Sequence, residues 1–323
     1  MLSFVLHRIW QFSLSLLGIT LLTFGILHLA PGDPTDIQTT LNPRVSAQAR
    51  ERLKTLYGLD RPLHIQYVDW LRRFISFDLG NSFVDGERVS EKILSRLPIT
   101  LIVNILSLAL IVMVSFPIGI LSATRQYSWF DRLTTLWVYI GFALPNFWVA
   151  MLLMLFFGVT LGWFPISGYQ SLSIAHMTPA ERFIDWSHHL TLPVLTASLG
   201  GLAGYSRYIR SEMLEVIRQD YIRTARAKGL SEMAVISKHA LRNALIPIVT
   251  LLGLEIPGLI GGSVIIETIF AIPGMGQLSY QAVLARDYPI IMGLTLFGAM
   301  LTLIGNFMAD LSYAWINPKI RPT

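Results

Sequence analysis

Three histidines, His176, His188 and His189, are the residues of this sequence best suited to hold a metal ion. Imidazole nitrogen is a common zinc ligand, so these residues introduce the hypothesis of a metal-dependent enzyme that works within a membrane. A metalloprotease His-Glu-x-x-His spacing does not accompany them, and vicinal histidines point to different faces of a helix. Polar side chains at a membrane surface are therefore the favoured interpretation, and the enzyme stays an alternative.

Glu255 is the second candidate, because it is the single charge in the apolar run 243–266. An ionised carboxylate in the middle of a membrane-spanning helix is costly, so Glu255 is expected to face a subunit interface or a watery path, or to be protonated. Pro257 removes a backbone hydrogen bond one turn back and, beside Gly258, permits a kink next to a cavity. A structural glutamate bonded to a neighbouring helix is the alternative, which the sequence leaves open.

The third candidate is the basic stretch 220–247, which reads DYIRTARAKGLSEMAVISKHALRNALIP. Residues 221–228 are expected to form a short helix ended by Gly229, which can adopt the left-handed conformation and would let two helices meet closely. Ser231 can cap a second helix. That helix is amphipathic, with one face formed by Met233, Ile236, Ala240 and Leu241 and another by Glu232, Lys238 and Arg242. The stretch is therefore expected to dock against a partner.

Two other functions of the basic stretch are weighed against docking. A nucleic-acid reader also combines helix, turn and helix with positive charge, but it normally needs its own three-helix core, and here both ends continue into apolar runs. A loop that anchors to anionic head groups would gain about 1 kcal/mol from each Lys or Arg. Anchoring explains the charge but neither the glycine nor the second apolar face.

These candidates lie in an unusually apolar chain, with 53% hydrophobic and 14% charged residues and a mean hydropathy of +0.55, against roughly 25% charged residues in soluble domains. Helices rather than barrel strands are expected, because the apolar runs are continuous and mostly about 20 residues or longer. The first run is too long for the apolar region of a signal peptide and lacks an A-x-A cleavage site. The chain is predicted to be an all-α integral membrane protein with six transmembrane helices, at residues 9–30, 98–124, 136–161, 190–206, 243–266 and 288–309.

Charge distribution predicts the orientation, because Lys and Arg are retained on the cytoplasmic side when connections are short. The connection 207–242 carries most of them, so it and both termini are placed in the cytoplasm. Segment 31–97 is placed outside, since nearly as many acidic residues accompany its basic ones and segments beyond about 60 residues escape the rule. The predicted parts are thus 1–30 with the first helix, the extracytoplasmic helical segment 31–97, and the five-helix core 98–323 with its cytoplasmic segment.

The extracytoplasmic segment contains the signals of two helices. Ser46 can cap a helix over 47–57, and Gly58 stands where that helix would stop. Pro62 suits a first helical position, and apolar residues then recur at helical spacing up to the turn at 78–80. A plain surface cap and a docking platform for a soluble partner are both kept as hypotheses.

The basic stretch resembles the cytoplasmic coupling motif of ABC importer permeases, in which Glu-Ala-Ala, three residues and Gly open a segment that docks into the ATPase subunit. Arg223 and Thr224 replace the Glu and the first Ala, while Ala225 and Gly229 match. Where the general pattern has Ile-x-Leu-Pro, this chain has His-Ala-Leu-Arg at 239–242. These departures resemble the dipeptide, oligopeptide and nickel branch, whose members read similarly to Tyr-x-Arg-Thr-Ala-Arg-Ala-Lys-Gly and His-x-Leu-Arg-Asn-Ala.

Further motifs extend the resemblance over essentially the whole chain. In order they are Pro-Gly-Asp-Pro at 31–34, Asp-Leu-Gly at 78–80 with Ser82, Ile-Phe at 269–270 with Pro-Gly-Met-Gly at 273–276, Arg-Asp-Tyr-Pro at 286–289, and Asn-Pro at 317–318. Each motif alone is weak, but their order along the chain is specific.

The resemblance implies a permease subunit that moves peptides or a related small solute into the cytoplasm, with a nickel chelate as the alternative. It implies four kinds of partner, which are a second homologous permease subunit, two ATPase subunits, an extracytoplasmic solute-binding protein and membrane lipid. Nucleic acid is not expected among them. The implied location is the bacterial or archaeal cytoplasmic (inner) membrane, crossed several times.

The chain is expected to be a transport subunit and no enzyme, with no catalytic residue, metal site or cofactor of its own. It lacks a Gly-x-x-x-x-Gly-Lys-Ser/Thr phosphate loop, so ATP and Mg are expected on partner subunits, and without Cys it has no thiol chemistry. A self-sufficient secondary carrier stays an alternative that would need a coupling-ion site within this chain. The predicted coupling contacts are Arg223, Thr224, Ala225, Arg226, Lys228, Gly229, His239 and Arg242, and Glu255 is the candidate for the translocation path.

Overall fold

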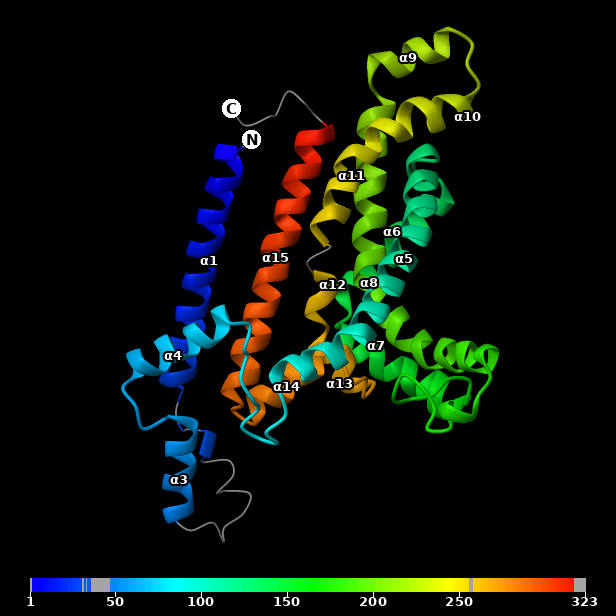
Figure 1. Ribbon diagram of the computed structural model, residues 1–323. Coiled ribbons are helices and arrows are strands. Elements are labelled where there is room, and N and C mark those ends of the chain that lie inside the picture. The colour runs from blue at the N-terminus through cyan, green and yellow to red at the C-terminus, as the bar shows by residue number, and fades with distance from the viewer. Residues whose placement is uncertain (1, 31, 33, 36–46, 256–257, 317–323) are drawn as a thin grey trace. The chain divides into compact units, whose positions relative to one another are not determined.

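The computed structural model of the chain describes residues 2–30, 32, 34–35, 47–255 and 258–316 (Figure 1). Within these ranges nearly all residues are helical, and the only strand-like pairing is an isolated bridge between Asn81 and Arg88. The predicted all-α fold is therefore confirmed. The chain divides into two compact units, Met1–Pro98 with Gly274–Thr323, and Ile99–Pro273.

The first unit pairs the first helix of the chain with the last. Helix α1 (Leu2–Leu29) lies along α15 (Tyr288–Ile316) in the opposite direction (Figure 1). The ring of Phe12 meets that of Phe307 edge to face at a centroid distance of 6.0 Å, and the hydroxyl of Tyr288 donates to a backbone carbonyl of α1 at 3.0 Å. Both helices are long and apolar enough to cross a membrane, so they are held together as a pair of spans.

The predicted extracytoplasmic segment contains the two helices that its sequence indicates, α3 (Ala47–Tyr57) and α4 (Leu63–Ile75). Gly58 ends α3 with a φ of +68°, a left-handed value that favours glycine. Pro62 occupies the N-cap of α4 rather than its first helical position. Ser46, the expected cap of α3, lies outside the described residues.

Two hydrogen bonds tie this segment to the first membrane helix. The hydroxyls of Tyr67 on α4 and Thr20 on α1 lie 3.0 Å apart, and Gln66 Oε1 lies 3.2 Å from His28 Nε2. Because both bonds join side chains distant in sequence, α4 is fixed against the C-terminal half of α1.

Two of the sequence motifs meet in the first unit. Asp287, from Arg-Asp-Tyr-Pro, is buried and accepts hydrogen bonds from the Ser82 hydroxyl at 2.5 Å and from the Phe83 N–H at 3.1 Å. The apolar core beside α14 (Met275–Leu284) is formed by Val89, Ile93, Met275, Leu278, Ala282 and Ile290. These motifs therefore serve the packing of this unit.

The second unit is built around α8 (Pro179–Ile217), a helix of 39 residues. Its most extensive contacts are with α6 (Trp129–Ala143), α7 (Asn146–Leu153) and α11 (Leu241–Glu255). The end of α5 (Val89–Thr124) packs on it so closely that a β-carbon at Gly119 would lie 2.7 Å from the side chain of Ile209. Glycine is thus required at this helix crossing.

The predicted third span, 136–161, is wrong as a single straight helix. Leu144 and Pro145 separate α6 from α7, which continues as the π-helix η1 (Met154–Thr160), and the two parts are bent by 102°. Pro145 explains the break, because proline disfavours the helical conformation of the residue before it, and Leu144 adopts φ −91° and ψ 126°. A short 3₁₀ helix, η2 (Ile174–His176), then precedes α8.

The predicted fifth span, 243–266, is also interrupted. Its described helical residues lie in α11, α12 (Gly258–Gly261) and α13 (Val264–Ile269), and the described break is the one between α12 and α13. Gly262 turns the chain with a φ of +68°, and the Ser263 side chain caps α13. Pro257, the expected site of a kink, lies outside the described residues.

Six transmembrane helices are not confirmed. Among the described residues, four helices are long and apolar enough to cross a membrane, and a fifth span results if the bent pair of α6 and α7–η1 counts as one. Helix α8, which contains the predicted span 190–206, is not one of the four. Glycine, serine and threonine are frequent in that uncharged stretch and lower its hydropathy.

Candidate functional site

The basic stretch 220–247 begins with a helical hairpin at one end of the second unit. Helix α9 (Asp220–Ala227) follows α8, and after a turn at Gly229 the chain returns as α10 (Glu232–Ala234) and the π-helix η3 (Val235–Ala240), which runs on into α11 (Figure 1). The predicted pair of short helices is present, with the first of them shifted by one residue. We call residues 220–240 the hairpin.

The inner face of the hairpin packs onto the longer helices. One apolar core joins α5, α8, α9, η3 and α11, and its buried members are Ala123, Ile209, Met213, Ile222, Ala225, Val235, Ala240, Ala244 and Ile248. Ala225, a predicted contact residue, belongs to this core and is not exposed to a partner. Because interiors are close-packed, a displacement of the hairpin must also displace the helices beneath it.

Gly229 has a φ of +77°, and its N–H donates to Arg226 O at 2.9 Å as α9 ends. The expectation that Gly229 lets the two helices meet closely is wrong, because a β-carbon there would have no heavy atom within 4 Å. Glycine is needed here for the left-handed backbone, which costs other residues free energy.

The second helix of the hairpin follows its predicted apolar face only in part. Ser231 caps it as expected, accepting a hydrogen bond from the Ala234 N–H at 3.4 Å. Of the predicted apolar face, Ala240 is fully buried and Ile236 and Leu241 are half-buried, but Met233 is 76% exposed, whereas Val235 is fully buried. The reason is that η3 is a π-helix, in which the hydrogen bonds span five residues and the side chains no longer follow a 3.6-residue period.

Polar side-chain contacts link the two helices of the hairpin to each other and to α11. Arg226 donates from Nε to Glu232 Oε1 at 2.8 Å and from its terminal nitrogen to Oε2 at 3.3 Å, across the glycine turn. Asn243 Nδ2 donates to the Tyr221 hydroxyl at 3.0 Å and thereby joins α11 to α9. Opposite charges on either side of a turn are a sequence signal for the first bond, but no local pattern places Tyr221 beside Asn243.

The other predicted contact residues lie on the outside of the hairpin or at its junction with α11. Arg223, Thr224, Lys228 and Arg242 are exposed and His239 is half-buried. Arg223 lies 3.3 Å from Asp220 in an exposed ion pair, which contributes little to stability. The arrangement therefore offers a largely basic outer surface on a rigid support, which suits a partner of complementary charge.

Glu255 is the last residue of α11 and is exposed in this chain. The hydroxyl of Tyr205 on α8 donates to Glu255 Oε1 at 3.4 Å. The sequence did not indicate Tyr205, because the two residues are far apart in the chain and such contacts leave no periodic signal.

A second carboxylate lies beyond the break in the same span. Glu267 on α13 is buried and accepts a hydrogen bond from Thr100 Oγ1 at 2.9 Å. Asn104, one turn along α5, donates to Leu259 O of α12 at 2.6 Å, so α5 supplies polar partners to the interrupted backbone. Glu267 escaped the sequence reasoning because it follows the predicted span 243–266; a carboxylate directly after an apolar run was the available signal.

His176, His188 and His189 do not come together as one group of possible metal ligands in the described structure. His189 Nδ1 lies 3.5 Å from Asp185 Oδ1, and Asp185 also accepts hydrogen bonds from the Ser171 N–H and hydroxyl. Burial acts to raise the pKa of the Asp185 carboxyl, but these hydrogen bonds outweigh it and hold the pKa below its usual value. Across the part of the chain that the structure describes, no group of three or more His, Asp or Glu could hold a metal ion.

The sequence matches two family models that together cover nearly the whole chain. Residues 115–322 match the model described as "Binding-protein-dependent transport system inner membrane component", and residues 1–104 match its N-terminal counterpart. The chain therefore belongs to the family of binding-protein-dependent transport system inner membrane components. Members of this family are the permease subunits of ABC transporters rather than enzymes.

Curated relatives cover the chain from end to end. It is 44% identical over 322 residues to the oligopeptide transport system permease protein AppB of Bacillus subtilis, covering 99% of this chain and 100% of the relative. It is 37% identical over 337 residues to the di/tripeptide transport system permease protein DppB of Pseudomonas aeruginosa, covering 99% of each. The alignment with a solved amino acid ABC transporter covers 69% of this chain and 92% of the transporter chain, with 16% sequence identity and a TM-score of 0.47.

Membership of the family confirms the resemblance that the motifs indicated. The chain is a multi-pass protein of the inner membrane, and an ABC permease of this family works with a binding protein and with ATPase subunits. Its apolar helices agree with that location.

Proposed function

We propose that this chain conducts peptides from an extracytoplasmic binding protein into the cytoplasm, as one of two homologous permease subunits driven by two ATPase subunits. The relatives named above transport oligopeptides or di- and tripeptides, which favours peptides over a nickel chelate. ATP and Mg would be held by the ATPase subunits, since this chain has no phosphate-binding loop.

The hairpin is the proposed contact with the ATPase. The observation that carries this proposal is the combination of an apolar inner face buried against α8 and α11 with an outer surface of exposed Arg and Lys. A surface loop that only touches lipid head groups needs the charge but not the packed inner face or the Arg226–Glu232 ion pair across the glycine turn. A rigid docking element needs all three, because it must transmit displacement without deforming.

Uptake by purified components tests the proposed division of labour. Liposomes that contain this chain alone are expected to take up no labelled peptide, because the chain has no means of hydrolysing ATP. Liposomes that also contain the second permease, both ATPases and the binding protein are expected to take up peptide only when ATP is supplied. Uptake by the chain alone, driven by a proton or sodium gradient, would identify a secondary carrier instead.

Sidedness is proposed from the charge distribution, with both termini and the hairpin in the cytoplasm and segment 31–97 outside. Gln48 and Ser237 are both exposed, and the chain has no Cys. We expect an impermeant maleimide to label Gln48→Cys in intact cells and Ser237→Cys only after permeabilisation. Labelling of both cysteines from the same side would show that the orientation is wrong.

Glu255 is proposed to line the translocation path. It is exposed within the predicted fifth span, and an ionised carboxylate in contact with lipid would be unfavourable. Peptides carry a protonated amino terminus, which a carboxylate can attract. Its hydrogen bond with Tyr205 would keep the carboxylate in one orientation.

A further inference from the structure

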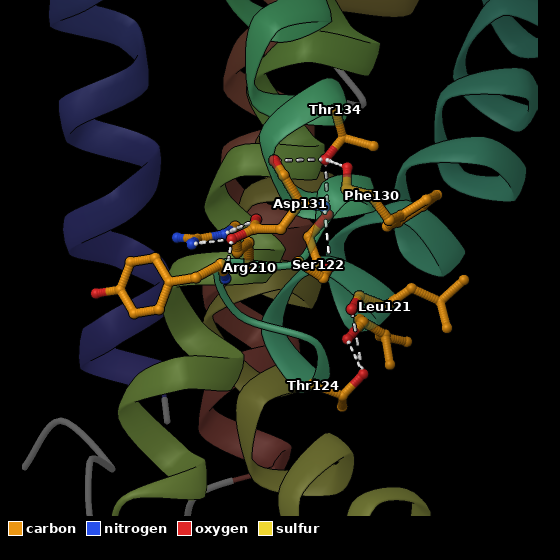
Figure 2. A network of polar contacts seen from close by, with 10 residues as sticks. Leu121, Ser122, Thr124, Phe130, Asp131, Thr134 and Arg210 are labelled. Carbon is orange, nitrogen blue, oxygen red and sulfur yellow. Dashed lines mark hydrogen bonds and ion pairs between the residues drawn. The ribbon is translucent and has the colours of Figure 1, made fainter.

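A buried ion pair lies within the second unit, close to the hairpin. Arg210 on α8 donates from Nε to Asp131 Oδ1 at 2.6 Å and from a terminal nitrogen to Asp131 Oδ2 at 2.8 Å (Figure 2). The side chains are 17% and 5% exposed, respectively. Two parallel charge-assisted hydrogen bonds hold a guanidinium and a carboxylate in one relative orientation, which a single ammonium contact does not.

Asp131 also fixes the turn between α5 and α6. Its carboxylate accepts the Tyr127 N–H at 2.9 Å, and its own N–H donates to the Ser128 hydroxyl at 3.3 Å. The hydroxyls of Ser122 and Thr134 lie 2.9 Å apart and join the end of α5 to the start of α6 (Figure 2). Asp131 therefore connects Arg210 to a turn that is already held rigidly.

Arg210 is directly next to the core of the hairpin. Its neighbour Ile209 and the residue one turn later, Met213, are fully buried in the same core as Ile222, Val235 and Ala240. The crossing of α5 and α8 at Gly119 also occurs at Ile209. One packed body thus contains the hairpin, the end of α8 and the turn between α5 and α6.

We propose that Asp131 and Arg210 are positioning residues for coupling, and that their ion pair makes α5 and α6 move with the hairpin when the ATPases move it. The proposal rests on the proposed function of the hairpin. Apolar packing of α6 on α8 is not directional, whereas the bidentate pair fixes one relative orientation and so opposes sliding more strongly. A pair that only stabilised the fold would be replaceable by neutral side chains without loss of coupling.

The double variant Asp131→Asn with Arg210→Gln tests this proposal, because it removes both charges and leaves no buried charge unpaired. In proteoliposomes with the partner subunits, we expect the number of peptides transported per ATP hydrolysed to fall about tenfold, with assembly retained. Arg210→Lys keeps the positive charge but not the two parallel hydrogen bonds, and its number of peptides transported per ATP is expected to fall less. Arg132→Gln, an exposed arginine beside Asp131, is the matched control and is expected to keep the ratio of the parent.

A distance measurement provides the readout that a purely structural role would not change. Cysteines replacing the exposed Arg125 and Ser237 can carry spin labels, one on the turn after α5 and one on the hairpin. We expect one narrow distance in the parent complex with and without a bound ATP analogue, and a broader or nucleotide-dependent distance in the double variant.

The proposal would be overturned if the double variant transported as many peptides per ATP as the parent and kept the same spin-label distance. If the double variant fails to assemble, Arg210→Lys provides the test. A number of peptides transported per ATP and a spin-label distance equal to those of the parent would then overturn the proposal. Gly229→Asp in the same assay separates the two proposals. If Gly229→Asp lowers the number of peptides transported per ATP and the double variant does not, only the proposed role of the Asp131–Arg210 pair is wrong. If neither variant lowers it, the proposed role of the hairpin is wrong as well.

Discussion

Replacing Gly229 with aspartate is expected to lower peptide transport by the assembled complex at least about tenfold, equivalent to about 1.4 kcal/mol. The φ of +77° at this position costs residues other than glycine free energy, although Asp and Asn tolerate it better than most. The new carboxylate also adds negative charge to a hairpin whose exposed contact residues are mainly basic. A β-carbon has open space there, so the chain is expected to stay folded in the membrane.

Transport and substrate-stimulated ATPase activity in proteoliposomes measure this effect. Gly229→Asn is the matched control, since asparagine has the same size as aspartate, tolerates the left-handed conformation and carries no charge. We expect the Asn variant to retain more coupling than the Asp variant. Substrate-stimulated ATPase activity of the Asp variant equal to that of the parent would refute the proposed role of the turn.

Replacing Glu255 with glutamine is expected to lower transport of peptides with a free amino terminus about tenfold, while transport of the same peptides after N-acetylation falls less than about twofold. A hydrogen bond to a charged group contributes about 1.5–3 kcal/mol, and glutamine keeps the shape of the side chain without its charge. Basal ATPase activity and assembly are expected to be unchanged, because the contact to Tyr205 is the one hydrogen bond that joins Glu255 to another helix in the described part of the chain.

Tyr205→Phe separates the two interpretations of Glu255. If the carboxylate serves mainly to hold α8 through the Tyr205 hydroxyl, the Phe variant should reproduce every effect of Glu255→Gln. If Glu255 meets the substrate, the Phe variant should weaken transport of both peptide forms slightly and equally. Equal losses for free and acetylated peptides in Glu255→Gln, or failure to assemble, would leave only the structural interpretation.

Short-range features of this protein could be predicted from its sequence. The helix over 47–57, the left-handed turn at Gly229 and the cap at Ser231 are all observed, because each depends on the conformational preferences of a few neighbouring residues. Membrane insertion follows from composition alone, since long uncharged runs have no other favourable environment. The order of the motifs indicated the family before any comparison.

Tertiary structure decided the features that depend on residues far apart in the chain. The pairs Arg210–Asp131, Ser82–Asp287 and Thr100–Glu267 join residues separated by 79 to 205 positions, which no periodicity can reveal. It also decided which hairpin residues are buried, because the π-helix η3 buries Val235, while Met233 of the predicted apolar face is exposed. Hydropathy records how many apolar residues follow one another. It does not record a helix break such as the one at Leu144–Pro145, nor the partner of a buried charge, because both depend on three-dimensional packing.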